Sequence, residues 1–430
     1  MSFNQRLEEI RTGFERPFWI ANISEIFERL SYYGAFASLG LYLHEKLNFS
    51  TQQTGTLTGW FGGMVWFLAI FGGAVADKIG FRRALSTAYL ILAAAYFLIG
   101  SIGDAWLAPV RNALPLGLFV GVILMLPALG ISMVKPCVVG TTARASKDSV
   151  RQIGYSIYYT MVNIGSLGGP YLASWAHAHL GVEKVFRISA LSVFAMFFFV
   201  LFFFREPRKA GDAPPPSLAT VARNFLTILW PPRFLVFLLI FTGYWVVYWQ
   251  QYTTLPRYIT DYVNSNKGVA ELILITDPLI VIFLTIAVNH LTRNIAPLRA
   301  VILGTVITSL SWLVLAFWPT VPGAVASLSV LALGEIIQQP PYYSYISKLA
   351  PPGQQGIYMG FAFLPLGLGS IFGGMLGGYL LHHYAEILHQ PQRVWYALTA
   401  VGLLTAALLL VYDRAIRPTA QGPAPLEAAH

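Results

Sequence analysis

Long apolar stretches recur along the whole chain, and each is close to the roughly 20 residues that an α-helix needs to cross a bilayer. Stretches of this length cross as helices, because lipid offers no hydrogen-bond partners to the backbone. The sequence therefore predicts an all-α membrane protein with about twelve spans, near 17–43, 54–76, 84–104, 112–143, 152–180, 186–204, 232–263, 268–291, 298–319, 323–349, 355–384 and 393–413.

Composition excludes several other classes of protein. Charged residues make up only 11% of the chain, against roughly 25% in soluble domains. The net charge of +9 lies in short gaps between apolar stretches and not on one continuous face, so it does not indicate nucleic-acid binding. The single cysteine, Cys137, excludes an intramolecular disulfide, and the histidines form no ligand cluster in the sequence. We expect no metal and no cofactor.

The basic gaps predict the topology. The even-numbered gaps and the two tails carry most of the Lys and Arg residues, which by the positive-inside rule places both termini in the cytoplasm of a multi-pass inner-membrane protein. The largest cytoplasmic gap, 205–231, contains the run Pro214 to Pro216. We interpret it as a linker between two six-helix bundles, 1–204 and 232–430. Arg257 and Asp261, near the end of the seventh span, and Lys267, just after it, are interpreted as a solvated outer loop.

Ionisable residues inside the spans predict the functional site. The first span contains Glu25, Glu28 and Arg29, the fourth contains Lys135, and the second half contains Asp277 and Glu335. A charge at mid-bilayer costs about 2.5 to 3.5 kcal/mol on insertion scales, so charges are retained there for a task. Helical spacing places Glu25, Arg29 and Tyr32 on one face of the first span.

These charges predict the chemistry of a ligand. Arg29 and Lys135 suit a carboxylate, whereas Asp277 and Glu335 suit an ammonium group, so the set favours a zwitterion. Because four acids face two cations, we expect at least one acid to carry a proton or to meet a cationic ligand. The alternative is a purely structural salt-bridge cluster in the first span.

Two motifs carry a resemblance to known transporters. The run Gly73-x3-Asp77-Lys78-x-Gly80-x-Arg82-Arg83 resembles the loop motif of the major facilitator superfamily, which implies gating roles for Asp77, Arg82 and Arg83. The run from Glu25 to Gly34 resembles the first-helix motif of the proton-dependent oligopeptide transporters. Further matches to that family occur at Gly130 to Pro136, Tyr155 to Leu167, Gly334 to Glu335 and Lys348 to Pro351.

The resemblance implies a transporter, embedded in membrane lipid, that moves di- and tripeptides with protons by alternating access, and we expect it to act as a monomer. Together with the buried charges, it predicts proton coupling through Glu25, Glu28, Asp277 and Glu335. The predicted substrate-binding residues are Arg29, Tyr32, Tyr33, Lys135, Tyr158, Asn163, Trp249, Gln250, Asp277 and Glu335.

Departures from the family pattern keep a second interpretation open. Trp249 stands where the family carries a seventh-helix Glu implicated in proton coupling, Asp277 replaces a common Asn, and Ala362 replaces a Trp. The alternative is a proton-independent or weakly coupled facilitator of another small organic acid, a nucleoside or a xenobiotic. A membrane enzyme is not expected, because no nucleophile with its base and no metal cluster is visible in the sequence.

Overall fold

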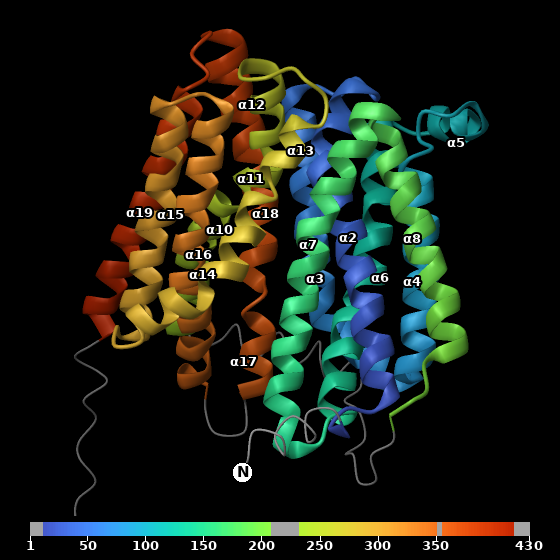
Figure 1. Ribbon diagram of the computed structural model, residues 1–430. Coiled ribbons are helices and arrows are strands. Elements are labelled where there is room, and N and C mark those ends of the chain that lie inside the picture. Colours follow the sequence, from blue (N-terminus) through green and yellow to red (C-terminus); the bar gives the residue numbers. More distant parts are fainter. Residues whose placement is uncertain (1–11, 208–231, 351–354, 417–430) are drawn as a thin grey trace, which may run out of the picture.

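The computed structural model describes residues 12–207, 232–350 and 355–416, and the regular elements of this part of the chain are helices (Figure 1). The first half contains α2 (Arg16–Glu45), α3 (Thr51–Ile79), α4 (Phe81–Ile99), η1 (Ala105–Leu107), α5 (Ala108–Ala113), α6 (Leu116–Arg144), η2 (Asp148–Val150), α7 (Arg151–His179) and α8 (Val182–Phe203). The second half contains α10 (Pro232–Tyr248), α11 (Gln250–Thr253), α12 (Leu255–Tyr262), α13 (Val269–Ile273), α14 (Thr276–Thr292), α15 (Pro297–Phe317), α16 (Val321–Leu349), α17 (Gln355–Phe361), α18 (Leu364–Leu380), η3 (Leu381–Ile387) and α19 (Arg393–Ile416).

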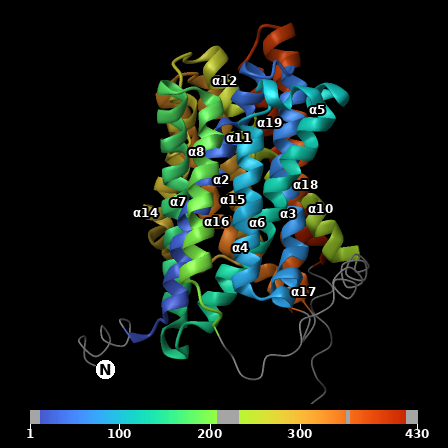
Figure 2. The ribbon, with the colours of Figure 1, turned by 90° about the vertical axis from the view of Figure 1, so that its right-hand side faces the viewer.

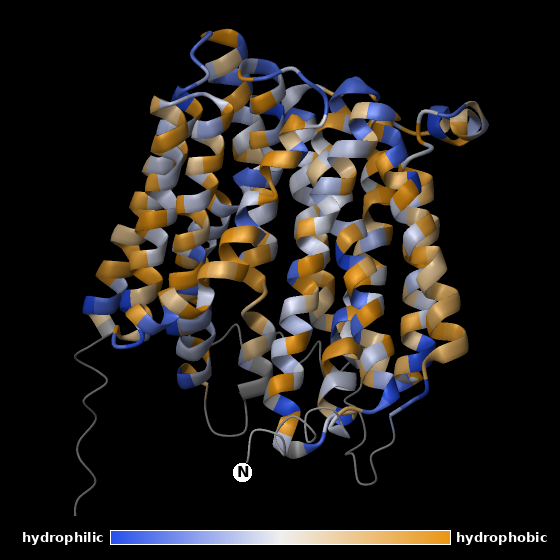
Figure 3. Cartoon of the chain, in the orientation of Figure 1, coloured by the Kyte–Doolittle hydropathy of each residue, from blue (hydrophilic) through white to orange (hydrophobic). Residues whose placement is uncertain are grey.

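These elements form twelve lengthwise segments within the described residues, because α10 to α12, α13 with α14, and α17 to η3 are each one interrupted crossing (Figures 1 and 2). Nine helices of the described part are long and apolar enough to cross a membrane, and a tenth, α3, passes as a bent pair. The two remaining lengthwise segments, α2 and α7, are long enough to cross a membrane but contain more polar residues. Hydrophobic residues predominate along the lengths of the helices, and hydrophilic residues gather toward the two ends of the bundle (Figure 3). The predicted all-α membrane fold is confirmed.

The helices pack in two groups that lie side by side in Figure 1. In the first group α2 contacts α7 and α8, α3 contacts α6, and α4 contacts α6 and α8. In the second, α15 contacts α16 and α19, α10 contacts α18 and α19, and α14 contacts α16. We call the groups the N half and the C half. Most of the predicted linker, 208–231, lies outside the described residues, so the domain boundary stays a prediction.

The two halves touch at the end of the bundle opposite the α3–α4 loop. We call this end the outer face, and the end with the α3–α4 loop the predicted cytoplasmic face. There α3 packs on α18, α12 on α2 and α13 on α7. A Cβ atom added at Gly374 of α18 would lie 2.2 Å from the carbonyl oxygen of Gly55 in α3, so the two backbones are in direct contact. Glycine is required for such an approach.

One expectation about the outer face is wrong. Arg257 does not lie in a solvated loop but is buried in α12, where it forms ion pairs with Asp261 at 2.7 Å and Glu386 at 3.6 Å. It also donates a hydrogen bond to the Thr51 hydroxyl of α3 at 3.3 Å. The sequence around Arg257 is polar because this cluster joins the two halves.

The predicted gating residues lie together at the predicted cytoplasmic face of the N half. Asp77 lies in the last turn of α3, 3.9 Å from Arg144 of α6. The backbone N–H of Arg82 donates to Glu206 at 2.9 Å, and its guanidinium donates to the Leu201 carbonyl at 2.6 Å. Arg83 lines an adjacent hollow. The motif thus connects α3, α4, α6 and the end of α8, and its gating role stays a prediction.

Candidate functional site

A cavity of about 470 Å³ lies between the two halves. Helices α2, α3, α6 and α7 line it from the N half, and α10, α11, α14, α16 and α18 line it from the C half. Several segments are broken beside it: α10 ends at Tyr248, one residue before Trp249, and α18 begins at Leu364 after a turn. Breaks of this kind expose polar groups at membrane depth only where they line a cavity.

Lys135 of α6 provides the positive charge of the cavity wall. Its ammonium nitrogen lies 4.3 Å from the centre of the Trp66 ring, a cation–π contact with α3. No carboxylate of the described residues lies within ion-pair distance of this ammonium. An ammonium held by an aromatic face keeps its hydrogen-bonding capacity for an anionic ligand. Lys135 is thus placed to receive a carboxylate.

Two acids from the C half provide the negative charge. The Tyr248 hydroxyl lies 3.3 Å from a carboxylate oxygen of Asp277 and 3.0 Å from one of Glu335. All three side chains line the cavity and come from α10, α14 and α16. A hydroxyl has one hydrogen to donate, so it cannot serve two ionised carboxylates at once. The hydrogen-bonding needs of the two carboxylates are met when one of the acids carries a proton or when a cationic ligand bridges the pair.

The charged cluster of α2 lies behind the cavity wall. The guanidinium of Arg29 donates to both carboxylate oxygens of Glu28, at 2.5 and 2.8 Å, and its Nε lies 3.5 Å from Glu25. Its exposed fraction is 2%, and both acids are fully buried. A fork-to-fork pair of this kind occupies the planar face with which arginine would bind a ligand carboxylate.

Close packing of α7 on α2 covers this cluster. A Cβ atom added at Gly165 would lie 2.6 Å from the Cβ of Arg29 and 2.6 Å from the carbonyl oxygen of Ile26. Any larger side chain would push the helices apart, which explains why the fifth span carries glycine beside Asn163. Tyr32 closes the other side, with the guanidinium carbon of Arg29 5.0 Å from its ring centre.

Comparison with known proteins decides the family. The family model described as Major Facilitator Superfamily matches residues 22–364 and 252–430. The chain belongs to the major facilitator superfamily. A protein of Aeromonas salmonicida named "Multidrug resistance protein MdtH" is 25% identical over 376 residues, which covers 85% of this chain and 89% of that protein. The protein of the same name from Edwardsiella ictaluri is 23% identical over 384 residues, covering 88% and 90%.

Several solved structures with the same fold carry the name of POT family or peptide transporters. A POT family transporter in complex with 5-aminolevulinic acid superposes with a TM-score of 0.74 at 16% identity, covering 93% of this chain and 96% of that one. The peptide transporter POT in complex with sulfate gives a TM-score of 0.75 at 20% identity, with 94% of both chains covered. The predicted superfamily fold and the expectation of a transporter, not an enzyme, are confirmed; at these identities the likeness to peptide transporters is one of fold.

The cavity of this major facilitator contains most of the predicted substrate residues. The predicted residues that line it are Tyr33, Lys135, Tyr158, Asn163, Trp249, Asp277 and Glu335. Trp249, in place of the family acid, faces the cavity and donates its indole N–H to the Leu366 carbonyl of α18 at 3.0 Å. It therefore joins two broken helices of the C half.

The predicted residues that do not line the cavity are Glu25, Glu28, Arg29, Tyr32 and Gln250. Gln250 is buried, and its side-chain amide donates to the carbonyls of Val246 at 2.7 Å and Gly373 at 3.0 Å. Its neighbour Trp249 is directed into the cavity. Successive residues of a helix project about 100° apart, and here the side chain of Gln250 is directed toward the backbone of α18 instead of the cavity.

Sequence reasoning missed part of the aromatic wall. Trp66, Trp245, Tyr252 and Tyr343 line the cavity of this transporter but were not predicted as site residues. Trp66 could have been found, because it follows Gly59 and Gly63 at helical spacing and therefore shares their face of α3. The charge count also omitted Glu271 of α13, which is fully buried and lies 2.7 Å from His177.

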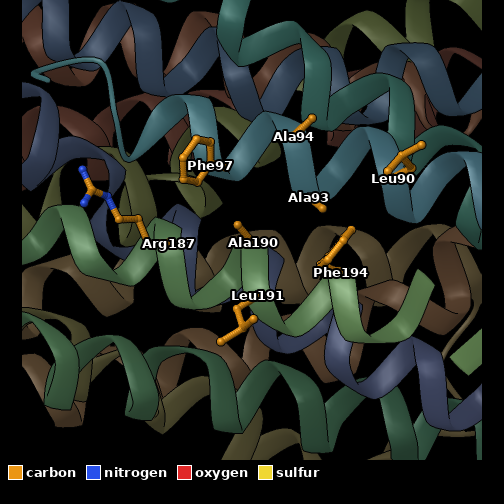
Figure 4. A pocket seen from close by; sticks show the side chains of 8 residues that line it. All are labelled: Leu90, Ala93, Ala94, Phe97, Arg187, Ala190, Leu191 and Phe194. Carbon is orange, nitrogen blue, oxygen red and sulfur yellow. The ribbon is translucent and has the colours of Figure 1, made fainter. Parts of the chain in front are cut away.

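A second large hollow, between α4 and α8, does not have the properties of a transport site (Figure 4). Its only charged lining residue is Arg187, which already pairs with Asp104 at 2.6 Å. The apolar lining residues Leu90, Phe97 and Leu191 are exposed on the outside of the bundle. This hollow faces the lipid.

Proposed function

We propose that this chain is a secondary active transporter of the inner membrane that moves small zwitterionic solutes, such as di- and tripeptides, by alternating access with proton symport. It works as a monomer with both termini in the cytoplasm. The observation that carries the proposal is the division of charge in the cavity: Lys135 comes from the N half, whereas Asp277 and Glu335 come from the C half.

A zwitterion fits this division. Its carboxylate meets Lys135 and its ammonium meets the acid pair, so the ligand connects the two halves through charge-assisted hydrogen bonds. Each bond forms across the plane along which the halves move. A bound solute would therefore stabilise the state in which the halves approach each other around the cavity, which is the event that alternating access requires. Arg29, locked by Glu28, orients α2 and does not itself hold the ligand.

The proton site is the acid pair. Tyr248 can donate to one carboxylate only, so Asp277 and Glu335 together bind a proton when no ammonium is present. This pair takes the place of the family acid that Trp249 replaces. Glu25 and Glu28, the other predicted coupling acids, hold Arg29 in the resting arrangement.

The aromatic wall favours a second candidate, the transport of lipophilic cations. Four of the cavity side chains are tryptophans or tyrosines contributed by α10, α11 and the break between them, namely Trp245, Tyr248, Trp249 and Tyr252. Aromatic faces beside two carboxylates bind quaternary or aromatic cations through cation–π contacts. The MdtH relatives carry the name of multidrug resistance proteins, which agrees with this alternative.

Uptake into proteoliposomes separates the two candidates. We expect counterflow of labelled dialanine that is accelerated by an imposed pH gradient, inside alkaline, and that is not competed by tetraphenylphosphonium. Dialanine amide, which lacks the carboxylate, serves as the matched ligand. Uptake of labelled tetraphenylphosphonium without dialanine counterflow would show that the substrate is a lipophilic cation and not a zwitterion. Dialanine counterflow that does not respond to the pH gradient would identify a facilitator.

A further inference from the structure

A buried titratable pair joins the two halves at the outer face, away from the substrate cavity. His177 lies near the end of α7, and Glu271 lies in α13. The two rank among the least accessible polar side chains of the protein, with exposed fractions of 3% and 0%. Neither lines the cavity between the halves. Transport through the cavity gives this pair no direct role.

The pair is part of a connected group. His177 Nδ1 lies 2.7 Å from Glu271 Oε1, and His177 Nε2 lies 3.5 Å from a carboxylate oxygen of Glu45. The Ser38 hydroxyl of α2 donates to the same oxygen of Glu271 at 3.1 Å. Glu271 belongs to the C half, and the other three residues of the group belong to the N half.

The number of protons on the imidazole determines how strong this link is. A neutral imidazole has one N–H and can donate to Glu271 or to Glu45, but not to both. The doubly protonated ring donates to Glu271, attracts the Glu45 carboxylate 3.5 Å from its Nε2, and neutralises a buried charge. When the ring loses its second proton, Glu271 remains in the interior without a cation, which is costly. The protonated ring therefore holds the halves together, and the neutral ring releases them.

The surroundings contain few other charges. Near Glu45 the further titratable groups are Lys267, in the loop before α13, and His44 of α2. His44 is bound to the carbonyl oxygen of Phe49 at 2.8 Å. Glu45 is 29% exposed and connects the buried ring to the outer solution. A proton can reach His177 through this carboxylate when the outer end opens.

We propose that His177 and Glu271 form a second proton-binding site, a latch whose protonation from the outer solution closes the outer face. It rests on alternating access and not on the identity of the solute. A symporter requires protonation to favour closure of the outer end and not its opening, because the outer end should close only after a proton has entered. The latch couples proton binding to movement of the halves independently of the acid pair in the cavity.

A distance measurement without substrate tests the latch. Spin labels on Leu180→Cys and Trp318→Cys, in a Cys137→Ser background, report the separation of the halves because both sites are exposed at the outer face. In nanodiscs, lowering the pH from about 8 to about 5 should raise the ratio of short to long distances about tenfold, within the usual range of coupling between two sites. His177→Gln and Glu271→Gln should each abolish this response.

His179→Gln is the matched control. His179 lies two residues away on α7, and its ring is hydrogen-bonded to the carbonyl of Trp175 in its own helix at 2.8 Å, so this variant should respond to pH like the parent. Glu45→Gln covers the case in which the buried substitutions do not fold; it should weaken the response. A pH response that persists in His177→Gln, or that is absent from the parent protein, would overturn the latch. Failure of dialanine uptake would reject the proposed solute and leave these distances as they are.

Discussion

Replacing Lys135 by glutamine is the sharpest test of the substrate site. Lys135 is the only cation among the residues that line the cavity in the described structure, and its ammonium nitrogen contacts Trp66 at 4.3 Å. A hydrogen bond to a charged group contributes about 1.5 to 3 kcal/mol. Its loss should therefore raise the half-saturating concentration of dialanine by about tenfold to 150-fold. Counterflow into proteoliposomes measures this value directly.

Three controls make the result interpretable. Dialanine amide has no carboxylate, so the substitution should leave its weak transport unchanged, whereas a collapsed cavity would lower transport of both ligands. Lys46→Gln removes a lysine that is 49% exposed and pairs with Glu183, and it should behave as the parent protein. Lys135→Arg should keep most of the affinity. If Lys135→Gln transports dialanine with unchanged affinity, the assignment of the carboxylate site is wrong.

Further predictions concern the proton site, the α2 cluster and the outer contact. Glu335→Gln removes one partner of the substrate ammonium, so it should weaken dialanine counterflow and make the remaining uptake insensitive to a pH gradient; a gradient-driven uptake in that variant would exclude the acid pair as the proton site. Glu28→Gln breaks a buried ion pair with Arg29 and should lower the free energy of unfolding by about 3 to 5 kcal/mol, measured by thermal unfolding in detergent. Gly374→Val should stop transport while the protein stays folded, because its side chain would overlap the backbone of Gly55; normal uptake by that variant would show that the contact is dispensable.

The sequence predicted the fold well because the bilayer imposes a simple rule. Each span must be about 20 apolar residues long and helical, so its position can be found without knowledge of its neighbours. The same rule marked the site. Helices α2 and α7 depart from the apolar pattern, and both contribute to the charged cluster or to the cavity wall. Lys135, Asp277 and Glu335 were found for a different reason, since each is a charged residue inside an otherwise apolar span.

The sequence could not decide which charges face the cavity. Arg29 and Lys135 are equally conspicuous in the sequence, yet Arg29 is covered by α7 and locked by Glu28, whereas Lys135 is held by an aromatic ring at the cavity wall. The difference arises from the packing of α7 on α2 at Gly165, a contact between residues 136 positions apart. Helical periodicity gives the face of a helix but not the neighbour that covers it.

At the outer face, too, the sequence shows which residues are charged, but only the tertiary structure shows their partners. Arg257 and Glu271 lie near the outer ends of two predicted spans, where a charged side chain can be buried or can reach solvent. Only the tertiary structure brings His177 to Glu271 and Thr51 to Arg257, across the two halves. The sequence by itself determined the spans and the chemical types that had to be sheltered from lipid, since both follow from local transfer free energies. The partners of those groups depend on contacts distant in the chain, which only the folded arrangement of the halves creates.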